Sequence, residues 1–208
     1  MGRKAKITKE MVLEAAYELL DESGIGAVGI KPIAAKLGCS TQPVSWLFGS
    51  MTELKKELYM YSANKVFGGL PEAMQGKDAV DAFFVSGVWY ISIACDHPNV
   101  FRFINVDDPV TTIGENIFGE RSIFTEQMNG MAVDMLAEQF KISKEKVGEA
   151  VQNTVIYTHG LSVMMMWDSY RLSKEAACRM IFDMGVKLMK DIGIEIKEKK
   201  WEDLAAFL

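Results

Sequence analysis

Three polar side chains just after position 40 have the types and the spacing to read DNA bases. Thr41, Gln42 and Ser45 follow a Gly38-Cys39-Ser40 turn that separates two short predicted helices. A tight turn of this kind sets the second helix across the first and presents its N-terminal residues to a DNA major groove. The glutamine amide can form two hydrogen bonds with an adenine edge. The segment therefore predicts a contact with double-stranded DNA.

The two helices before this segment are predicted from caps and apolar spacing. Thr8 can cap a helix that ends at Gly24, because its hydroxyl satisfies a free backbone N–H and glycine suits the residue after a helix. The second helix has Pro32 in its first turn and ends at Gly38. The apolar stripe of the first helix lies on one face and consists of Val12, Ala15, Ala16 and Leu19.

The predicted recognition helix covers residues 41–48. Val44 and Phe48 are four residues apart, so both face the core and leave the polar residues on the outward side or near the exposed N-terminus. Trp46 and Leu47 are expected to have different roles. One should pack against the following helix, and the other should contact a thymine methyl group or a sugar. The sequence does not say which does which.

A further helix and a break follow the recognition helix. Ser50 and Glu53 form a capping box that opens a helix over residues 51–67. The strongest break in the chain is Gly68-Gly69-Leu70-Pro71. We therefore expect a DNA-binding domain at 1–67, including the linking helix 51–67, and a second domain at 72–208.

The rest of the chain shows helical periodicity without an alternating strand pattern. Residues 110–121 are expected to be irregular or weakly helical. The predicted class is all-α: an N-terminal three-helix helix-turn-helix DNA-binding domain followed by a larger helical ligand-binding and dimerisation domain. Its further helices are expected at 78–95, 99–105, 122–140, 143–167, 173–191 and 201–208.

Charge is divided unevenly along the chain, whose net charge is −5. Residues 1–67 carry nine Lys or Arg against seven Asp or Glu, and the remainder carries fourteen against twenty-one. Arg3, Lys4 and Lys6 lie in a polar N-terminal arm that would suit the phosphate backbone, although the same charges would suit a solvated tail. Lys31 and Lys55 are the other candidate phosphate contacts.

Composition and the absence of known motifs argue against several other classes of protein. A chain of 208 residues with 49% hydrophobic residues can build a real core. Its three cysteines are far apart, so they predict neither a disulfide framework nor a metal site. The chain has no Glu-x-x-His pair, GxSxG elbow or P-loop, so we expect no enzyme and no cofactor. The N-terminus lacks an apolar signal region and no apolar run approaches membrane-spanning length, which predicts a cytoplasmic protein without a membrane partner.

The first part of the chain resembles the DNA-binding domain of TetR-family transcriptional regulators. The resemblance covers about the first 60 residues and implies a ligand-responsive regulator, most often a repressor. Beyond them it is only a layout of long helices. The matching residues are Thr8, Ala15-Ala16, Gly24, Ile33-Ala34, Leu37-Gly38, Ser40, Val44, Phe48 and Leu54.

Three positions depart from the family pattern. Ser45 stands where the family usually has tyrosine, Leu47 where it has histidine or a similar residue, and Met51 where it has lysine. These family residues commonly contact phosphates, whereas the positions retained here are packing positions. An alternative function is therefore a helical module that binds small molecules and has weak or lost DNA binding.

The second domain is rich in aromatic and sulfur-containing side chains. These could line a pocket for a largely apolar small molecule, although methionine at helical spacing is also usual in a core or subunit interface. His159 lies beside Gly160 within a long predicted helix, where it is either an ordinary satisfied histidine or a ligand contact. The ligand-binding candidates are Trp89, Phe101, Phe103, Met128, Met131, Tyr157 and His159, with Tyr90 as a further aromatic residue in the same segment.

A homodimer follows from the size of the recognition helix. One short helix reads few base pairs, so specificity requires two copies on a two-fold symmetric site. Helices 143–167 and 173–191 can each present an apolar face. Paired with their symmetry mates, they would form a four-helix interface.

Overall fold

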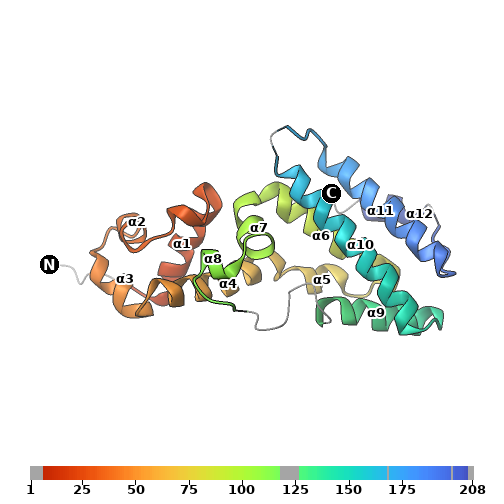
Figure 1. The fold of residues 1–208 in the computed structure, drawn as a ribbon, viewed down its shortest axis with the longest axis horizontal. Coiled ribbons are helices and arrows are strands. Elements are labelled where there is room, and N and C mark those ends of the chain that lie inside the picture. Colours follow the sequence, from red (N-terminus) through yellow and green to blue (C-terminus); the bar gives the residue numbers. More distant parts are fainter. Residues whose placement is uncertain (1–6, 118–126, 168, 198, 206–208) are drawn as a thin grey trace. The chain divides into compact units, whose positions relative to one another are not determined.

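The structure, a computed structural model, describes residues 7–117, 127–167, 169–197 and 199–205. All regular elements in these ranges are helices, from α1 (Lys9–Ser23) to α12 (Lys199–Ala205) (Figure 1). The expected all-α class is therefore confirmed. The described residues form two compact units: the first runs up to Gly68 and includes the segment from His97, and the second comprises Gly69–Asp96 and the helices from α9 onward.

The first unit begins with the predicted helices. Thr8 caps α1, its hydroxyl accepting a hydrogen bond from the Met11 N–H at 3.3 Å, and the Gly24 N–H ends the helix on the Leu20 carbonyl at 2.8 Å. A single 3₁₀ turn at Ile25–Ala27 leads to the next helix. The following helices are α2 (Ile30–Lys36), α3 (Thr41–Phe48) and α4 (Met51–Phe67).

The capping box predicted at the start of α4 is only half formed. The Ser50 hydroxyl accepts from the Glu53 N–H at 3.1 Å, as expected. The Ser50 N–H, however, donates to the Phe48 carbonyl at 2.8 Å, and the Glu53 carboxylate binds Lys56 at 3.1 Å. A tight turn between α3 and α4 thus takes the donor that the carboxylate would otherwise satisfy.

Two short helices from later in the chain complete the first unit. Helix α7 (Pro98–Asn105) packs against α1 and α4, and α8 (Pro109–Thr112) follows it. The Tyr59 hydroxyl donates to the Ile104 carbonyl at 2.8 Å, and the Tyr59 and Phe103 rings meet edge to face at 5.7 Å. By contacts, residues 97–117 thus group with the N-terminal helices, although the boundary at 67–72 assigned them to the second domain. The functional division itself remains a prediction.

The second unit is built around α6 (Ala79–Asp96). This helix packs against α5 (Leu70–Met74), α9 (Gln127–Phe140), α10 (Lys144–Met165), α11 (Lys174–Asp191) and α12. Phe84 of α6 packs on Phe182 of α11 with ring centroids 4.8 Å apart. Gly185 allows this approach, because a methyl group there would lie 2.6 Å from Phe84 Cε1. Small residues therefore set how closely α6 and α11 pack.

The polar residues on the buried face of α10 satisfy their own hydrogen bonds. Thr154, Thr158 and Ser162 are buried and follow one another at intervals of four residues. Each hydroxyl donates at 2.8 Å to the backbone carbonyl four residues earlier. All three hydroxyl hydrogens therefore have an acceptor, so this face of α10 can pack against apolar side chains.

Helix α6 corrects one expectation about membranes. It has 18 residues with a mean hydropathy of 1.3, so within the described residues one helix does reach membrane-spanning length and composition. Half of that stretch is buried inside the protein. A helix that is buried on several sides needs no polar face. This explains why the sequence of the central helix of this unit is apolar almost throughout.

Candidate DNA-binding site

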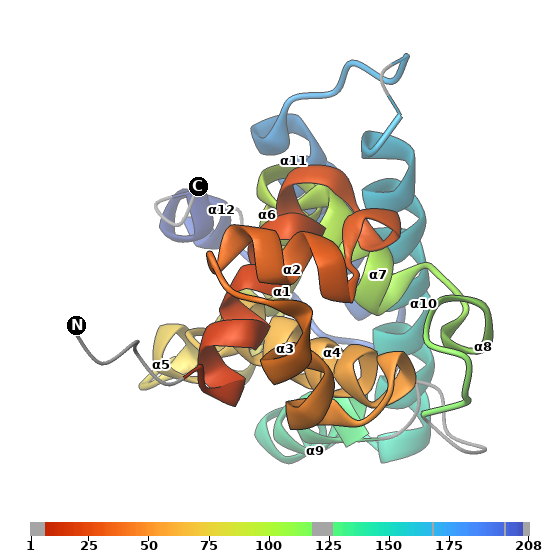
Figure 2. The same ribbon diagram turned by 90° about the vertical axis from the view of Figure 1, so that its left-hand side faces the viewer.

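The turn between α2 and α3 has the geometry of a helix C-terminus closed by glycine. Gly38 adopts a φ of 61°, a left-handed conformation that strains other residues. Its N–H donates to the Ala35 carbonyl at 3.1 Å, and the Cys39 N–H donates to the Ala34 carbonyl at 3.0 Å. These two bonds form a Schellman motif, which ends α2 and redirects the chain within three residues. Figure 2 shows α2 and α3 next to each other.

Two apolar side chains fix the rotation of α3. Val44 is fully buried and Phe48 is 7% exposed, so both pack inward as predicted. They meet a core that includes Ile33 of α2 and Leu54 of α4, both almost fully buried. Because two residues of one face are held, the direction of every other side chain on this helix is set.

The predicted base contacts on α3 differ in exposure. Thr41 and Gln42 are exposed at its N-terminus, whereas Ser45 is half-buried and its hydroxyl donates to the Thr41 carbonyl at 3.1 Å. Trp46 is 77% exposed and Leu47 is half-buried. Of these two neighbours, Trp46 is the one that a groove would meet.

Most lysines described in this unit are held by carboxylates. Lys9 pairs with Glu57 at 2.5 Å, and Lys65 pairs with Glu14 at 2.5 Å. The carboxyl pKa of Glu14 is lowered by hydrogen bonds from Lys65 and Tyr61. Each cation that is neutralised within the protein is less available to a phosphate. The first unit is therefore less basic toward DNA than its lysine content suggests.

The same holds for the end of α2. Lys36 pairs with Glu18 at 2.9 Å and with Glu22 at 3.3 Å, both on α1. These contacts, the hydrogen bond to Glu18 foremost, raise the pKa of Lys36. They tie α2 to α1 and support the orientation of the turn that follows, although exposed pairs contribute little stability each.

The predicted phosphate contacts have different surroundings. Lys31 is exposed in the first turn of α2. The Lys55 ammonium instead donates to the Thr112 carbonyl at 2.6 Å, a partner 57 residues away that the sequence pattern did not reveal. Arg3, Lys4 and Lys6 lie outside the described residues.

Comparison with known proteins agrees with this geometry. Residues 12–58 match the family described as "Bacterial regulatory proteins, tetR family", a span from α1 to α4 that includes the whole helix-turn-helix. An uncharacterized HTH-type transcriptional regulator, YobS of Bacillus subtilis (strain 168), is 17% identical over 84% of this chain and 87% of its own length. The crystal structure of a TetR transcriptional regulator from Rhodococcus sp. RHA1 shares the fold with a TM-score of 0.50, 15% identity and coverage of 88% of this chain and 95% of that one.

The chain carries a TetR-family DNA-binding domain over residues 12–58. It is thus a DNA-binding transcriptional regulator of the helix-turn-helix type and not an enzyme. The apolar residues of the family pattern, such as Val44 and Phe48, are mostly buried in the structure, whereas Thr8, Gly38 and Ser40 lie at exposed helix ends. Sequence alone could identify the family because packing positions recur at fixed spacing in the helix-turn-helix.

The three departures from the TetR pattern lie on or next to α3. The Ser45 hydroxyl bonds its own helix, Leu47 is half-buried, and Met51 is half-buried at the first position of α4. None of these side chains offers a phosphate a cation or a free hydroxyl hydrogen. In this regulator, contacts with the DNA backbone must therefore come from other residues.

The ligand-binding candidates are divided between the two units. Phe101 is fully buried and Phe103 almost so, and both belong to the core of the first unit. In the second unit, Trp89 and Tyr157 are half-buried and Met131 is 63% exposed. The side chain of Met128 lies outside the described residues. A role for any of them in ligand binding remains a prediction.

One polar pair stands out among the half-buried residues of the second unit. His159 Nδ1 of α10 and the Tyr90 hydroxyl of α6 are hydrogen-bonded at 2.8 Å. Burial lowers the pKa of His159, which favours the neutral imidazole. The two residues are 69 positions apart, so sequence spacing could not reveal the pair.

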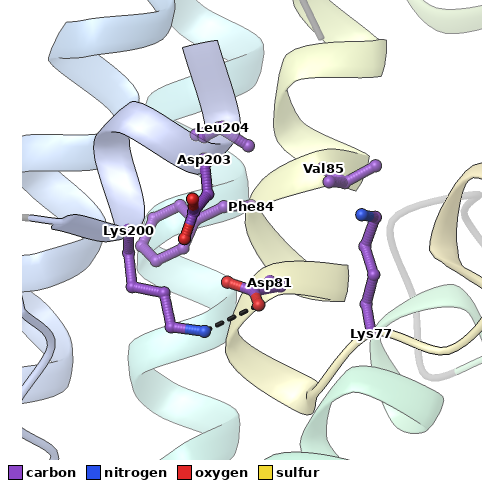
Figure 3. Close-up of a pocket in the computed structure, with 7 residues that line it drawn as sticks. All are labelled: Lys77, Asp81, Phe84, Val85, Lys200, Asp203 and Leu204. Atoms are coloured by element: carbon purple, nitrogen blue, oxygen red, sulfur yellow. Dashed lines mark hydrogen bonds and ion pairs between the residues drawn. The ribbon is translucent and has the colours of Figure 1, made fainter. Parts of the chain in front are cut away.

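A small cavity in the second unit lies elsewhere. It has a volume of about 50 Å³ and is lined by residues of α6 and α12 and by Lys77 (Figure 3). Lys200 closes one side by binding Asp78 at 2.8 Å and Asp81 at 2.6 Å. This volume holds a few waters at most, and no ligand-binding candidate lines it. Among the described residues, no group of His, Cys, Asp and Glu could hold a metal ion.

Proposed function

We propose that this TetR-family regulator is a cytoplasmic repressor that acts as a homodimer on a two-fold symmetric operator and responds to a largely apolar small molecule. One observation carries the DNA-binding part of the proposal. Helix α3 buries Val44 and Phe48 and leaves Thr41, Gln42 and Trp46 exposed. A short helix fixed in this way and opened by a tight turn is the element that enters a major groove.

The DNA-binding part is tested by selecting bound fragments from the genome of the source bacterium. The enriched fragments are then used in a gel shift with excess competitor DNA. The proposal requires a sequence-specific band that survives competitor. Smearing that vanishes as salt is raised would contradict it and favour the alternative function, a small-molecule-binding module with weak DNA contact.

The dimer is supported by exposed apolar side chains on α10 and α11 and at Trp167, just after the end of α10. Ile156 and Trp167 are 61% and 57% exposed, and Met164 and Met180 are each 36% exposed. In water, an apolar face of this kind is unfavourable unless a partner covers it. A second copy of the chain would bury both faces in a four-helix interface.

The dimer is tested by one charge substitution and a matched control. Ile156→Glu places a carboxylate in the proposed interface, so light scattering during size-exclusion chromatography should give the mass of a monomer. Met60→Glu on α4 is the control, because Met60 is 60% exposed and lies in the other unit. A dimer that persists in Ile156→Glu, or that Met60→Glu also dissociates, contradicts this interface.

The ligand response is supported by the path of the chain between the units. Helix α6 ends at Asp96 and α7 begins at Pro98, so His97 alone separates them. His97 Nδ1 is hydrogen-bonded to the Asp21 carboxylate at 2.9 Å, and the Asn99 amide donates to the Asp21 carbonyl at 2.8 Å. A ligand that shifts α6 would therefore pull on α1 of the DNA-binding unit through this connection.

Thermodynamic reciprocity tests this coupling without knowledge of the regulated genes. Apolar compounds are screened for thermal stabilisation, and the dissociation constant of the best binder is measured with and without operator DNA. A coupling of about 1–3 kcal/mol would change that constant by about 5- to 150-fold. A stabilising ligand whose affinity does not depend on operator DNA would contradict the sensing function.

A further inference from the structure

The recognition helix has no charged side chain. Its sequence, residues 41–48, contains neither Lys or Arg nor Asp or Glu. Arginine and lysine make the commonest specific contacts with guanine, and carboxylates accept hydrogen bonds from cytosine. Helix α3 therefore lacks the side chains that usually read G·C base pairs.

The residues that α3 does expose match the other base pair. Gln42 presents an amide, whose carbonyl and NH₂ fit the N6 and N7 atoms of adenine. Trp46 lies one helical turn later on the same face and exposes 77% of its surface. A large apolar side chain at the mouth of a groove gains most where it covers the C5-methyl group of thymine.

Ser45, between them, adds little to this reading. Its hydroxyl hydrogen is donated to the Thr41 carbonyl at 3.1 Å, so the side chain can act toward a base only as an acceptor. Beyond Thr41 at the first position of the helix, the exposed side chains of α3 are thus Gln42 and Trp46.

We propose that α3 reads A·T base pairs in each operator half-site, Gln42 binding an adenine edge and Trp46 covering a thymine methyl group. This specificity rests on the proposed DNA-binding function. It makes Trp46 a specificity-determining residue and assigns the substrate class of the site as an A·T-containing major groove.

Replacing thymine by uracil tests the proposal, because it removes only the methyl group. Operator sequences are selected from a random library, and each thymine of the half-site is replaced in turn. Binding is measured by fluorescence anisotropy for the wild type, Trp46→Ala and the control Met60→Ala, an exposed apolar residue on α4. At one position per half-site, uracil should weaken wild-type and Met60→Ala binding about fourfold, the value of one buried methyl group, and leave Trp46→Ala unaffected.

The outcomes separate this specificity from the function on which it rests. Specific binding to a half-site that is G·C throughout the α3 contacts, or specific binding without any uracil effect, overturns the specificity and leaves the regulator function intact. Equal binding to all sequences overturns both.

A different set of contacts carries a second inference, about the start of α4. The Lys55 ammonium donates to the Thr112 carbonyl at 2.6 Å, and Lys56 pairs with Glu115 at 2.5 Å. A methyl group on Gly114 would lie 3.5 Å from the Thr52 hydroxyl oxygen, so the segment runs close to the first turn of α4. The hydrogen bond to Glu115 is the main reason that the pKa of Lys56 is raised.

These lysines are well placed to meet DNA. They are the first cations after the recognition helix, and they lie one turn into a helix whose N-terminus favours anions. We infer that residues 112–115 compete with DNA phosphates for Lys55 and Lys56. This segment thereby lowers the affinity of the regulator for DNA. When residues 112–115 are released from α4, the affinity for DNA increases.

The substitution Glu115→Gln tests this competition. It should lower the dissociation constant for DNA and steepen the salt dependence by up to about one unit of slope per subunit, because Lys56 then keeps only its pairing with Glu53 at 3.1 Å. Asp107→Asn is the matched control, because it also removes one carboxylate from residues 97–117. In the wild type, Asp107 pairs with Arg102 at 3.0 Å and not with a residue of α4. Equal changes in the two variants, or no change in Glu115→Gln, would overturn the inference.

Discussion

Deleting residues 2–6 should remove most of the salt dependence that this regulator shows toward DNA. In the described residues of the first unit, Lys9, Lys36, Lys56 and Lys65 are paired with carboxylates. Within Met1–Gly68 and His97–Gly119 the sequence has ten Lys or Arg and ten Asp or Glu, and three of those cations are Arg3, Lys4 and Lys6. Without the arm, seven cations face ten acidic residues, so the unit becomes net negative.

The size of the effect follows from counterion release. Each phosphate neutralised by a cation contributes about 0.9 to the slope of log affinity against log salt, so three cations contribute about 2.7 per subunit. Between 50 and 200 mM salt, a slope of this size corresponds to about a 40-fold loss of affinity per subunit. The deletion should abolish this loss and weaken binding to all DNA sequences alike.

The assay is a salt titration by fluorescence anisotropy on a specific and a non-specific duplex. A variant in which Lys141, Lys144 and Lys146 are changed to glutamine is the control, because it removes the same charge from the second unit. Its slope should stay close to that of the wild type. An unchanged slope in the deletion variant would refute the role of the arm and assign phosphate binding to lysines that are now paired.

Three further substitutions test individual residues. Met51→Lys adds a cation at the start of α4, so it should raise the DNA affinity measured by anisotropy with little change in site preference. The cation faces the positive end of the helix macrodipole, so thermal unfolding should show a loss of about 0.3–1 kcal/mol of stability. Lower DNA affinity in a folded variant would show that this turn does not face the DNA backbone. Gln42→Ala should cost about 1–3 kcal/mol at one base pair per half-site in a panel of operator variants, whereas an even loss across the panel would make Gln42 a backbone contact. Gly185→Ala should lower the free energy of unfolding by about 1–3 kcal/mol, because the added methyl group would lie 2.6 Å from Phe84, and an unchanged denaturation midpoint would show that the ring can move aside.

Local signals in the sequence predicted the N-terminal helices well. Thr8, Gly24, Gly38 and Gly49 mark the helix ends where the structure has them, because capping depends on residues within a few positions. The inward direction of Val44 followed from spacing alone. The family resemblance rests on the same local pattern, which is why it fades beyond helix α4.

Long-range partners could not be predicted in this way. The bond from Lys55 to Thr112 and the pair of Tyr90 with His159 join residues 57 and 69 positions apart. Only the fold decides such neighbours. For the same reason, sequence placed Phe101 among ligand candidates, whereas the structure places it in the core of the first unit.

The exposed face of α3 is the central feature of this account, and the specificity ratio tests it most directly. The dissociation constants for a selected operator and for a scrambled duplex of the same length are measured by anisotropy at 0.15 M salt. If α3 reads bases in a major groove, the operator should bind at least about 1,000-fold more tightly. Equal constants for the two duplexes would contradict the account, because backbone contacts alone cannot distinguish them.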